Sequence, residues 1–366
     1  MSKSFSPVRV KVLLDEISTQ KDKEWVIQAE GGFLFSDREK NAKKFNYTKE
    51  ELNVSVDEGT LYVNGKRFLK QQLFIKPSYN LLELNGNFYK GSFLFLVQDE
   101  RLFLINVVSL EDYIFGVLRS ESWPGWPLEV NKVFAVATRS YVIAKAMEAK
   151  RRGKSFHIKN TRQHQTYNGH HFMKRNSKVL WQAVQETKGV FLAHENQPIL
   201  AMFDSCCGGI VPSKVEGFDF KKAPYLARDY ACEHCKVCNL YRWDVSYDYQ
   251  KWTELLQKQF PDLQKLRSMK VLLRDDAGLI KSIEIKDGTQ TFQMTGKQLY
   301  SLLDEVKSFF FYIKKEGNQI VLKGRGYGHH IGLCQWGARE MVRQDCDYRK
   351  ILEFYYPNTK FVRLIA

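Results

Sequence analysis

The sequence predicts an α+β fold in which helices and antiparallel strands are mixed. Strand-like segments fill the first hundred residues, where apolar stretches end at Gly, Asn and Asp. Two helical patterns follow over residues 110–150, and the last third mixes predicted hairpins with short helices. This order of elements argues against a doubly wound sheet. We therefore place a β-rich N-terminal subdomain at residues 1–108 and a second, functional region at residues 109–366.

Strands are predicted at residues 9–16, 58–68 and 91–109, because their apolar residues alternate or form short runs. Asn64-Gly65 lies between two such segments, and this dipeptide favours a tight hairpin turn. The N-terminal part is therefore expected to be built of antiparallel strands.

The first helix is predicted to begin after Ser109, whose hydroxyl can cap the free backbone amides while Asp112 reaches back. It is expected to end near Arg119, with Glu121 just beyond it. Pro127 suits the first position of a second helix, whose apolar residues recur at steps of three and four up to the basic residues near position 151. Glu121 is thus expected in a short, rigid connection between two helices.

The rest of the chain is predicted from shorter patterns. A polar and aromatic loop follows residue 153, and two hairpin turns are expected at Asp287-Gly288 and Gly317-Asn318. The remaining expected elements are a helix at 178–186, strands at 189–193 and 198–205, and helices near 296–305, 335–344 and 347–356.

Composition indicates a globular chain with a basic surface. The chain has 366 residues, of which 44% are hydrophobic and 27% charged, and its net charge is +15. No apolar run reaches the roughly 18 residues of a membrane helix, and the first residues form no recognisable signal peptide. The charge suits anionic partners such as nucleic acid, acidic lipid or acidic glycan.

Glu121 is a candidate general acid because aromatic residues follow it closely. It is followed by Trp123, Pro124, Gly125 and Trp126. Burial against aromatic walls raises the pKa of a carboxyl group, because it disfavours the charged form. The alternative is structural: Glu121 could cap a helix or pair with Arg119 or Arg139.

Residues 324–340 contain five glycines, two histidines, a glutamine and a tryptophan. Such glycine density permits positive φ angles and close approach of the backbone to another group. The segment matches neither a phosphate-binding loop nor a dinucleotide fingerprint. A structural turn remains the alternative to a binding loop.

Cysteines are clustered, with Cys232, Cys235 and Cys238 in a C-x-x-C-x-x-C pattern and Cys207 upstream. These four could bind a structural zinc ion as a tetrahedral thiolate set. A Cys207–Cys232 disulfide is the alternative in an oxidising compartment. Half of an iron–sulfur pattern is a third reading, although its fourth ligand is missing.

Several segments, taken in order, resemble the stage II sporulation protein D (SpoIID) family, which is grouped with amidase enhancers. They are NVVSLEDYIFGVLRSESWPGWPLEVNKVFAVATRSYVIAKA, QTYNG, SCCGG, APYLARDYAC, GRGYGHHIGLCQWGARE and YRKILEFYYPNTK. The resemblance covers roughly residues 80–366.

The resemblance implies a peptidoglycan lytic transglycosylase acting on glycan strands stripped of their stem peptides. The family's catalytic glutamate matches Glu121, which would protonate the glycosidic oxygen between N-acetylmuramic acid and N-acetylglucosamine and yield a 1,6-anhydro product. No cofactor is required for this chemistry. Stripped strands are polyanions, which gives the positive charge a role, and no nucleic-acid partner is expected. The family also implies a periplasmic or other extracytoplasmic location.

The resemblance further implies a long substrate groove in the α+β body. The residues expected to bind substrate match family motifs or lie beside them: Trp123, Arg139, Ser140, Tyr141, Gln165, Tyr167, Tyr225, His329 and Gln335.

Some positions depart from the family pattern. His330 replaces the second glycine of Gly-His-Gly, which would cost about 1–2 kcal/mol if a positive φ is needed there. His164 stands where relatives often have cysteine, and the C-x-x-C-x-x-C segment is not a general family feature. A second hypothesis is therefore a glycan-binding protein without turnover that recruits or stimulates an amidase. A zinc-stabilised nucleic-acid binder is a third, but it leaves Glu121 unexplained.

Overall fold

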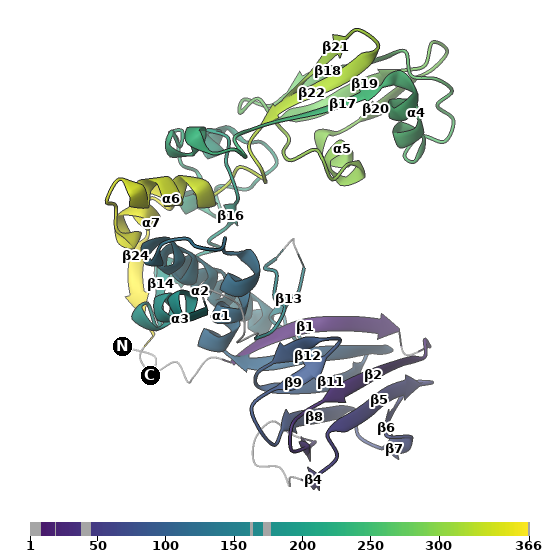
Figure 1. Ribbon diagram of the computed structural model, residues 1–366, viewed down its shortest axis with the longest axis vertical. Helices are drawn as coiled ribbons and strands as arrows, with labels where there is room; N and C mark the ends of the chain where they lie inside the picture. Colours follow the sequence, from purple (N-terminus) through teal and green to yellow (C-terminus); the bar gives the residue numbers. More distant parts are fainter. Residues whose placement is uncertain (1–8, 19, 38–44, 162–163, 171–176, 365–366) are drawn as a thin grey trace. The chain divides into compact units, whose positions relative to one another are not determined.

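The computed structural model describes residues 9–18, 20–37, 45–161, 164–170 and 177–364. The chain forms two compact units. The first comprises residues 1–200 and 360–366, and the second comprises residues 201–359. The predicted boundary at residue 108 falls inside the first unit. Helices and mostly antiparallel sheets occur together in the described residues, as expected for an α+β protein (Figure 1).

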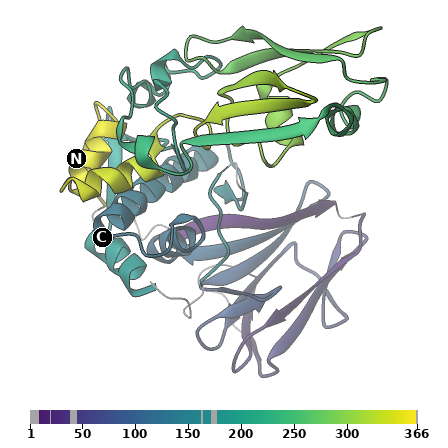
Figure 2. The same ribbon diagram turned by 45° about the horizontal axis from the view of Figure 1, so that its top comes forward.

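The first unit is built around two sheets. One has the strand order β13-β1-β12-β11-β8-β3-β4 and the other the order β10-β9-β2-β5-β6-β7. Their strands lie in two layers (Figures 1 and 2), and Trp25 of β2 packs edge-on against Phe95 of β11, with ring centroids 5.4 Å apart. The strands are β1 (Arg9–Ser18), β2 (Lys23–Gln28), β3 (Phe33–Ser36), β4 (Phe45–Tyr47), β5 (Glu51–Asp57), β6 (Thr60–Val63), β7 (Lys66–Phe68), β8 (Gln72–Pro77), β9 (Leu82–Leu84), β10 (Asn87–Tyr89), β11 (Ser92–Gln98), β12 (Arg101–Ser109) and β13 (Ile158–Lys159).

The predicted hairpin at Asn64-Gly65 is confirmed. The two residues join β6 to β7 and have φ angles of 49° and 72°. A two-residue turn with both φ angles positive matches the twist of the strands it connects, which explains the preference for Asn-Gly.

The helical layer of the first unit consists of α1 (Leu110–Glu121), α2 (Leu128–Arg151) and α3 (Ser177–Glu186). Helix α1 begins as predicted: the Ser109 hydroxyl accepts a hydrogen bond from the Asp112 amide. It ends two residues later than expected, so that Glu121 is its last residue. Pro127 precedes α2 as its N-cap, because its ψ of 156° is extended rather than helical.

A third sheet, of order β15-β14-β24, completes the first unit and contacts α2. It contains β14 (Val190–His194), β15 (Gln197–Pro198) and β24 (Lys360–Arg363). The prediction of a single strand at 198–205 is wrong, because two separate short strands occur there. Its start pairs with β14, whereas β16 (Phe203–Asp204) pairs with β23 in the second unit.

The second unit contains two three-stranded sheets, β17-β22-β21 and β18-β19-β20, and a small parallel pair of β16 with β23. Trp252, Leu256, Ile283, Phe311 and Leu322 belong to its hydrophobic core. Its other elements are β17 (Arg242–Asp248), β18 (Ser268–Arg274), β19 (Ile280–Lys286), β20 (Thr291–Met294), β21 (Phe311–Glu316), β22 (Gln319–Arg325), β23 (Leu333–Cys334), α4 (Tyr249–Gln257), α5 (Gly296–Leu302), α6 (Gln335–Arg343), α7 (Tyr348–Tyr355) and the 3₁₀ helices η1 (Pro212–Lys214), η2 (Pro224–Leu226) and η3 (His234–Val237).

Both hairpins predicted in the last third are present, as β19–β20 and β21–β22. Among the described residues, no helix combines the length and apolarity needed to cross a membrane.

Candidate functional site

Glu121 occupies the C-terminal end of α1, where it is partly buried. Its Oε1 accepts a hydrogen bond of 2.5 Å from the backbone N–H of Thr166. Burial raises the pKa of the Glu121 carboxyl, and the Thr166 N–H bond acts in the opposite direction. The group therefore keeps its proton to higher pH than an exposed glutamate, while one oxygen stays oriented.

The segment 165–169 lies against α1 because α1 has a glycine where they meet. A Cβ on Gly116 would lie 2.5 Å from a ring carbon of Tyr167 and 2.7 Å from the carbonyl oxygen of Gly169. The Ser120 hydroxyl accepts a second bond, of 3.4 Å, from the Asn168 amide. Close packing of this segment on α1 thus brings the Thr166 amide to Glu121.

Tyr167 anchors the same segment in the core instead of presenting its ring at the surface. Its side chain is fully buried, its hydroxyl donates to Asn106 at 2.8 Å, and its amide donates to Asn160 at 2.8 Å. Its ring packs at 5.2 Å from that of Tyr113. The expectation that Tyr167 lines a groove is therefore corrected: it positions the chain that holds Glu121.

Gln165 is also buried, and its side-chain oxygen accepts a bond of 2.8 Å from the Tyr113 hydroxyl. Its Nε2 donates to none of the described residues. A buried amide donor without a partner is unfavourable unless something else accepts from it. Gln165 adjoins Thr166 in the chain, so this donor belongs to the segment that contacts Glu121.

The two tryptophans after Glu121 stack on each other, with ring centroids 6.1 Å apart and an angle of 19°. Trp126 is buried and packs on Phe134 of α2, whereas Trp123 is 37% exposed. The Asn131 amide group donates to the Trp126 carbonyl at 3.0 Å, and its oxygen accepts from Ser122 at 2.6 Å. The turn is thus rigid and presents one indole to solvent.

Sequence reasoning missed Thr166 and Asn131. Asn131 is a polar residue on the apolar face of the predicted second helix. A polar residue in that position is the sequence signal that could have identified it. Nothing local marks Thr166, because its contact with Glu121 spans 45 positions of the chain.

Arg139 and Ser140 on α2 are structural rather than exposed. The Arg139 guanidinium has no exposed surface, and its Nη2 lies 2.6 Å from Oε2 of Glu111 on α1. It also donates to the Val190 carbonyl at 2.9 Å. Ser140 accepts from the Leu192 amide at 2.8 Å. We correct the expectation that they line a groove, because both bind α2 to its neighbours.

Tyr141 lies on α2 with 9% of its surface exposed. Burial raises the pKa of its hydroxyl to about 12, and the charges of Glu148 and Glu121 add to this effect. Tyr141 is therefore a neutral hydroxyl within electrostatic reach of Glu121.

Tyr225, His329 and Gln335 belong to the second unit. Tyr225 lies in η2 and Gln335 is the first residue of α6, and both are buried. His329 is partly exposed, and its Nε2 lies 2.9 Å from the Phe203 carbonyl oxygen. Burial lowers the pKa of His329.

His330 has a φ of 69°, a left-handed conformation that is strained for a residue other than glycine. Its amide donates to Asp204 at 2.7 Å, and its Nδ1 lies 2.9 Å from the Cys207 carbonyl oxygen. Asp204 is buried, which raises the pKa of its carboxyl well above the usual range. Asp204 was not predicted, although a lone acid in an apolar run marks it.

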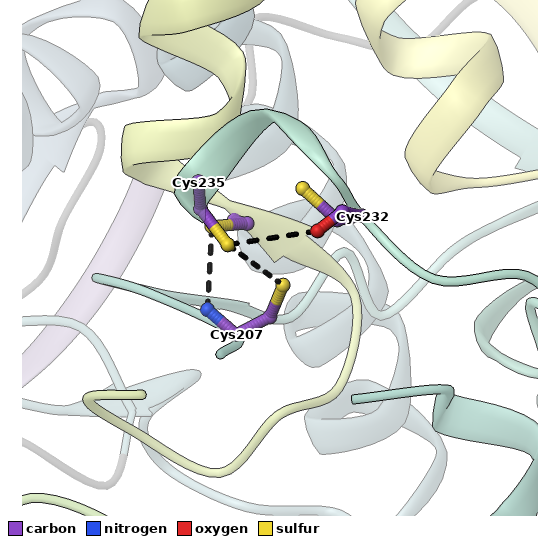
Figure 3. A group of neighbouring side chains, drawn as sticks. Cys207, Cys232 and Cys235 are labelled. Atoms are coloured by element: carbon purple, nitrogen blue, oxygen red, sulfur yellow. Dashed lines mark hydrogen bonds between the residues drawn. The ribbon is translucent and has the colours of Figure 1, made fainter. Parts of the chain in front are cut away.

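Four cysteines of the second unit lie together: Cys207, Cys232, Cys235 and Cys334. All are buried, and their sulfur atoms lie within 4.8 Å of one another. Figure 3 labels Cys207, Cys232 and Cys235. Such a group of thiols could hold a metal ion. The predicted set of four is wrong in one member, because Cys334 takes the place of Cys238. The Cys238 sulfur instead accepts a hydrogen bond of 3.1 Å from the Leu240 amide.

Comparison with known proteins identifies the family. A sequence model of the stage II sporulation protein (SpoIID) family matches residues 98–194, which include α1, Glu121 and Thr166. The chain belongs to the SpoIID family. A second model, of a domain of unknown function (DUF8618), matches residues 224–332.

Relatives of this SpoIID-family chain extend the match well beyond that segment. It is 30% identical over 319 residues to an uncharacterized protein of Brachyspira hyodysenteriae, covering 86% of this chain and 81% of that protein. It is 24% identical to the amidase enhancer of Bacillus subtilis, covering 84% of this chain but only 49% of that protein. It is 26% identical to stage II sporulation protein D of Bacillus subtilis, covering 69% and 74%.

Proposed function

We propose that this SpoIID-family protein is a peptidoglycan lytic transglycosylase with Glu121 as its general acid and base. The observation that most supports this is the partly buried carboxyl of Glu121, whose pKa is raised by burial and whose Oε1 is held by Thr166. A general acid must stay protonated near the working pH and must point in one direction. The pKa raised by burial and the oriented Oε1 of Glu121 favour it for this role.

In the proposed reaction, Glu121 donates its proton to the glycosidic oxygen between N-acetylmuramic acid and N-acetylglucosamine. The bond from C1 to that oxygen breaks, and N-acetylglucosamine leaves with a free 4-hydroxyl. The C6 hydroxyl of the muramic acid attacks C1, and the Glu121 carboxylate takes the hydroxyl proton. A 1,6-anhydro end forms, and Glu121 is protonated again. The Thr166 N–H stabilises the carboxylate between these two proton transfers.

This scheme uses one carboxyl group, in contrast to hydrolases that employ a pair of carboxylates. The nucleophile is the sugar's own hydroxyl, so the reaction as proposed requires no cofactor. Substrate would be held by the exposed indole of Trp123. The net charge of +15 favours denuded strands, whose lactyl carboxylates are free. We place this activity at the cell wall, outside the cytoplasmic membrane.

A second candidate is a glycan-binding protein that recruits or stimulates an amidase without cutting the strand. The named amidase enhancer among its relatives favours this candidate. The match covers 49% of the amidase enhancer, so the remainder of that protein lies outside the match.

The test is mass spectrometry of purified denuded strands after incubation with the parent chain and with Glu121→Gln. We expect anhydro-muramic fragments from the parent and a loss of about 10²–10⁴-fold in the variant, which is the usual worth of a general acid. The control is Glu186→Gln, because Glu186 is an exposed carboxylate in the same unit that pairs with Lys132 and accepts from Gln182, away from Glu121. It should cut like the parent.

Fragments with reducing ends would show that water is the nucleophile and would contradict the proposed mechanism. If the parent and Glu121→Gln bind strands equally and neither cuts, the amidase-stimulating candidate is the correct one.

A further inference from the structure

The four clustered cysteines are not used by the proposed reaction, and they come from three separate segments. Cys207 follows β16, Cys232 and Cys235 flank the start of η3, and Cys334 is the N-cap of α6. Figure 3 shows Cys207, Cys232 and Cys235 turned toward one another. Each of the four side chains is at least nine-tenths buried, so the sulfurs meet inside the unit.

The spacing of the sulfurs fits one tetrahedral ion. A zinc–sulfur distance of about 2.3 Å puts the corners of a tetrahedron about 3.8 Å apart. The Cys207 and Cys235 sulfurs are 3.7 Å apart, and all four lie within 4.8 Å. A four-iron cluster needs wider spacing, because its irons and sulfides lie between the cysteine sulfurs.

Two backbone N–H groups point at the sulfur of Cys334, as expected for a thiolate ligand. Cys334 Sγ accepts from the amides of Cys207 and Gly337, each at 3.3 Å. Because Cys334 caps α6, its sulfur also lies at the positive end of that helix. The Tyr355 hydroxyl lies 3.1 Å from Cys232 Sγ. Such contacts orient metal ligands and offset their charge.

α6 approaches the sulfurs through a glycine. A Cβ on Gly337 would lie 2.7 Å from Cys232 Sγ and 2.1 Å from the Tyr355 hydroxyl oxygen. The close packing of α6 against the four cysteines therefore depends on the absence of a side chain at Gly337.

We propose that Cys207, Cys232, Cys235 and Cys334 bind one zinc ion in a closed, structural site. Four protein ligands leave no open position for a substrate or a reactive water, so the ion would stabilise the fold and take no part in cleavage. This inference is independent of the proposed activity of Glu121.

The ion would join three of the segments that resemble the family, SCCGG, APYLARDYAC and GRGYGHHIGLCQWGARE. Next to the ligands, the Cys206 amide donates to the Tyr327 carbonyl at 3.1 Å, and the Tyr327 amide donates back at 2.7 Å. The Cys207 carbonyl is 2.9 Å from the His330 ring nitrogen. Binding Cys207 to Cys334 through a metal would thus hold the glycine-rich segment and its strained His330 in place.

The experiment measures metal content in the full chain, purified under reducing conditions without a histidine tag. Inductively coupled plasma mass spectrometry should find one zinc per chain. Replacement by Co²⁺ should give visible bands typical of tetrahedral thiolate coordination, in the unmutated protein. Cys235→Ser and Cys334→Ser should each lose stoichiometric zinc.

Two matched variants should keep the ion. Cys238→Ser distinguishes the proposed set from the contiguous C-x-x-C-x-x-C set, and Cys346→Ser removes a partly exposed cysteine outside the group. Removal of zinc by a chelator should also increase hydrogen exchange at residues 203–209 and 326–337 while β18–β20 stay protected.

The proposal is overturned if the unmutated chain holds no zinc and no bound Co²⁺ spectrum develops. A Cys207–Cys235 disulfide found by peptide mass analysis of chain purified separately without reductant would also overturn it. Loss of zinc from Cys238→Ser together with retention in Cys334→Ser would refute the ligand set.

Discussion

Glu121 is subject to two opposing influences that suit a group alternating between acid and base. Burial favours the protonated carboxyl, and the Thr166 N–H favours the carboxylate, with burial the larger effect. A purely structural carboxylate would be stabilised in its charged form by a cation. Glu121 is instead held by Thr166, a neutral residue, which fixes the direction of the carboxyl without supplying a positive charge.

Burial of Glu121 makes the stability of the protein depend on pH in a definite direction. Its pKa is raised above the ordinary value of 4.5, so between the unfolded and folded values the native state holds a proton that the unfolded chain has released. Stability attributable to this group is therefore lost as pH rises through that interval. We expect Glu121→Gln to melt at the parent's temperature below pH 4 and at a higher temperature near pH 7.

Thermal unfolding followed by circular dichroism at a series of pH values measures this difference. Glu195→Gln is the control, since the Glu195 side chain is 86% exposed. A Glu121→Gln variant that becomes less stable than the parent as pH rises would contradict the raised pKa.

His330 shows how a residue can occupy an unfavourable backbone conformation. A left-handed φ costs a non-glycine residue about 1–2 kcal/mol. Here the side chain is fully buried and bonded to the Cys207 carbonyl, and the amide is bonded to Asp204. Each such bond contributes about 0.5–1.5 kcal/mol net, so together they offset strain of this size.

Helix α2 connects the elements around the candidate site through one internal ion pair. Arg139 lies between α1, the end of α3 and β14, and it is bonded to Glu111, Val184 and Val190. Glu111 also accepts from the Gly189 amide at 3.2 Å. Glu111 and Glu121 lie at opposite ends of α1. The Arg139–Glu111 pair therefore positions the helix that carries Glu121 without itself contacting the reacting atoms.

Removal of one partner of this pair should be costly. Arg139→Met leaves the Glu111 carboxylate, whose side chain is only 16% exposed, without its cation. We expect the free energy of unfolding to fall by about 3–5 kcal/mol, measured by urea denaturation. The double variant Arg139→Met/Glu111→Gln should recover part of that loss, because no buried charge remains unpaired.

The control lies at the C-cap of the same helix. Arg152 pairs with Glu148 at 2.9 Å but is 64% exposed, so Arg152→Met should cost only about 0.3–0.5 kcal/mol. An Arg139→Met variant as stable as the parent but unable to bind glycan strands would show instead that Arg139 contacts substrate.

The second unit is an insertion in the topology of the first. Residues 201–359 enter after β15 and return at β24, and both strands pair with β14. Pro198 and Lys360 both pair with Ala193, one on each side. Strands on either side of a third are about 10 Å apart, so the two ends of the insertion leave the first unit close together.

Excision of the insertion should therefore leave a folded unit. We expect a chain in which residues 201–359 are replaced by a flexible linker of about six residues to retain cooperative thermal unfolding, because such a linker easily spans this gap. The bond between Thr166 and Glu121 lies entirely in the retained part. Circular dichroism and amide NMR dispersion measure the outcome, and a chain without an unfolding transition would contradict it.

Local patterns in the sequence were enough to predict much of the fold. The Ser109 cap, the course of α1 and α2, the Asn64-Gly65 turn and the later hairpins depend on residues within a few positions of each other. Glu121 could be singled out for the same reason, since its aromatic neighbours are adjacent in the chain. The motif resemblance to the SpoIID family was confirmed by the comparisons.

Contacts between distant residues could not be predicted in this way. Thr166 reaches Glu121 across 45 positions, Arg139 reaches Glu111 across 28, and Cys334 approaches Cys207 across 127. Periodicity says which face of an element is buried, but not which partner covers it. The motif residues Arg139 and Tyr167 are therefore buried supports, and Cys334 rather than Cys238 completes the group of four thiols, because tertiary packing sets which side chains meet.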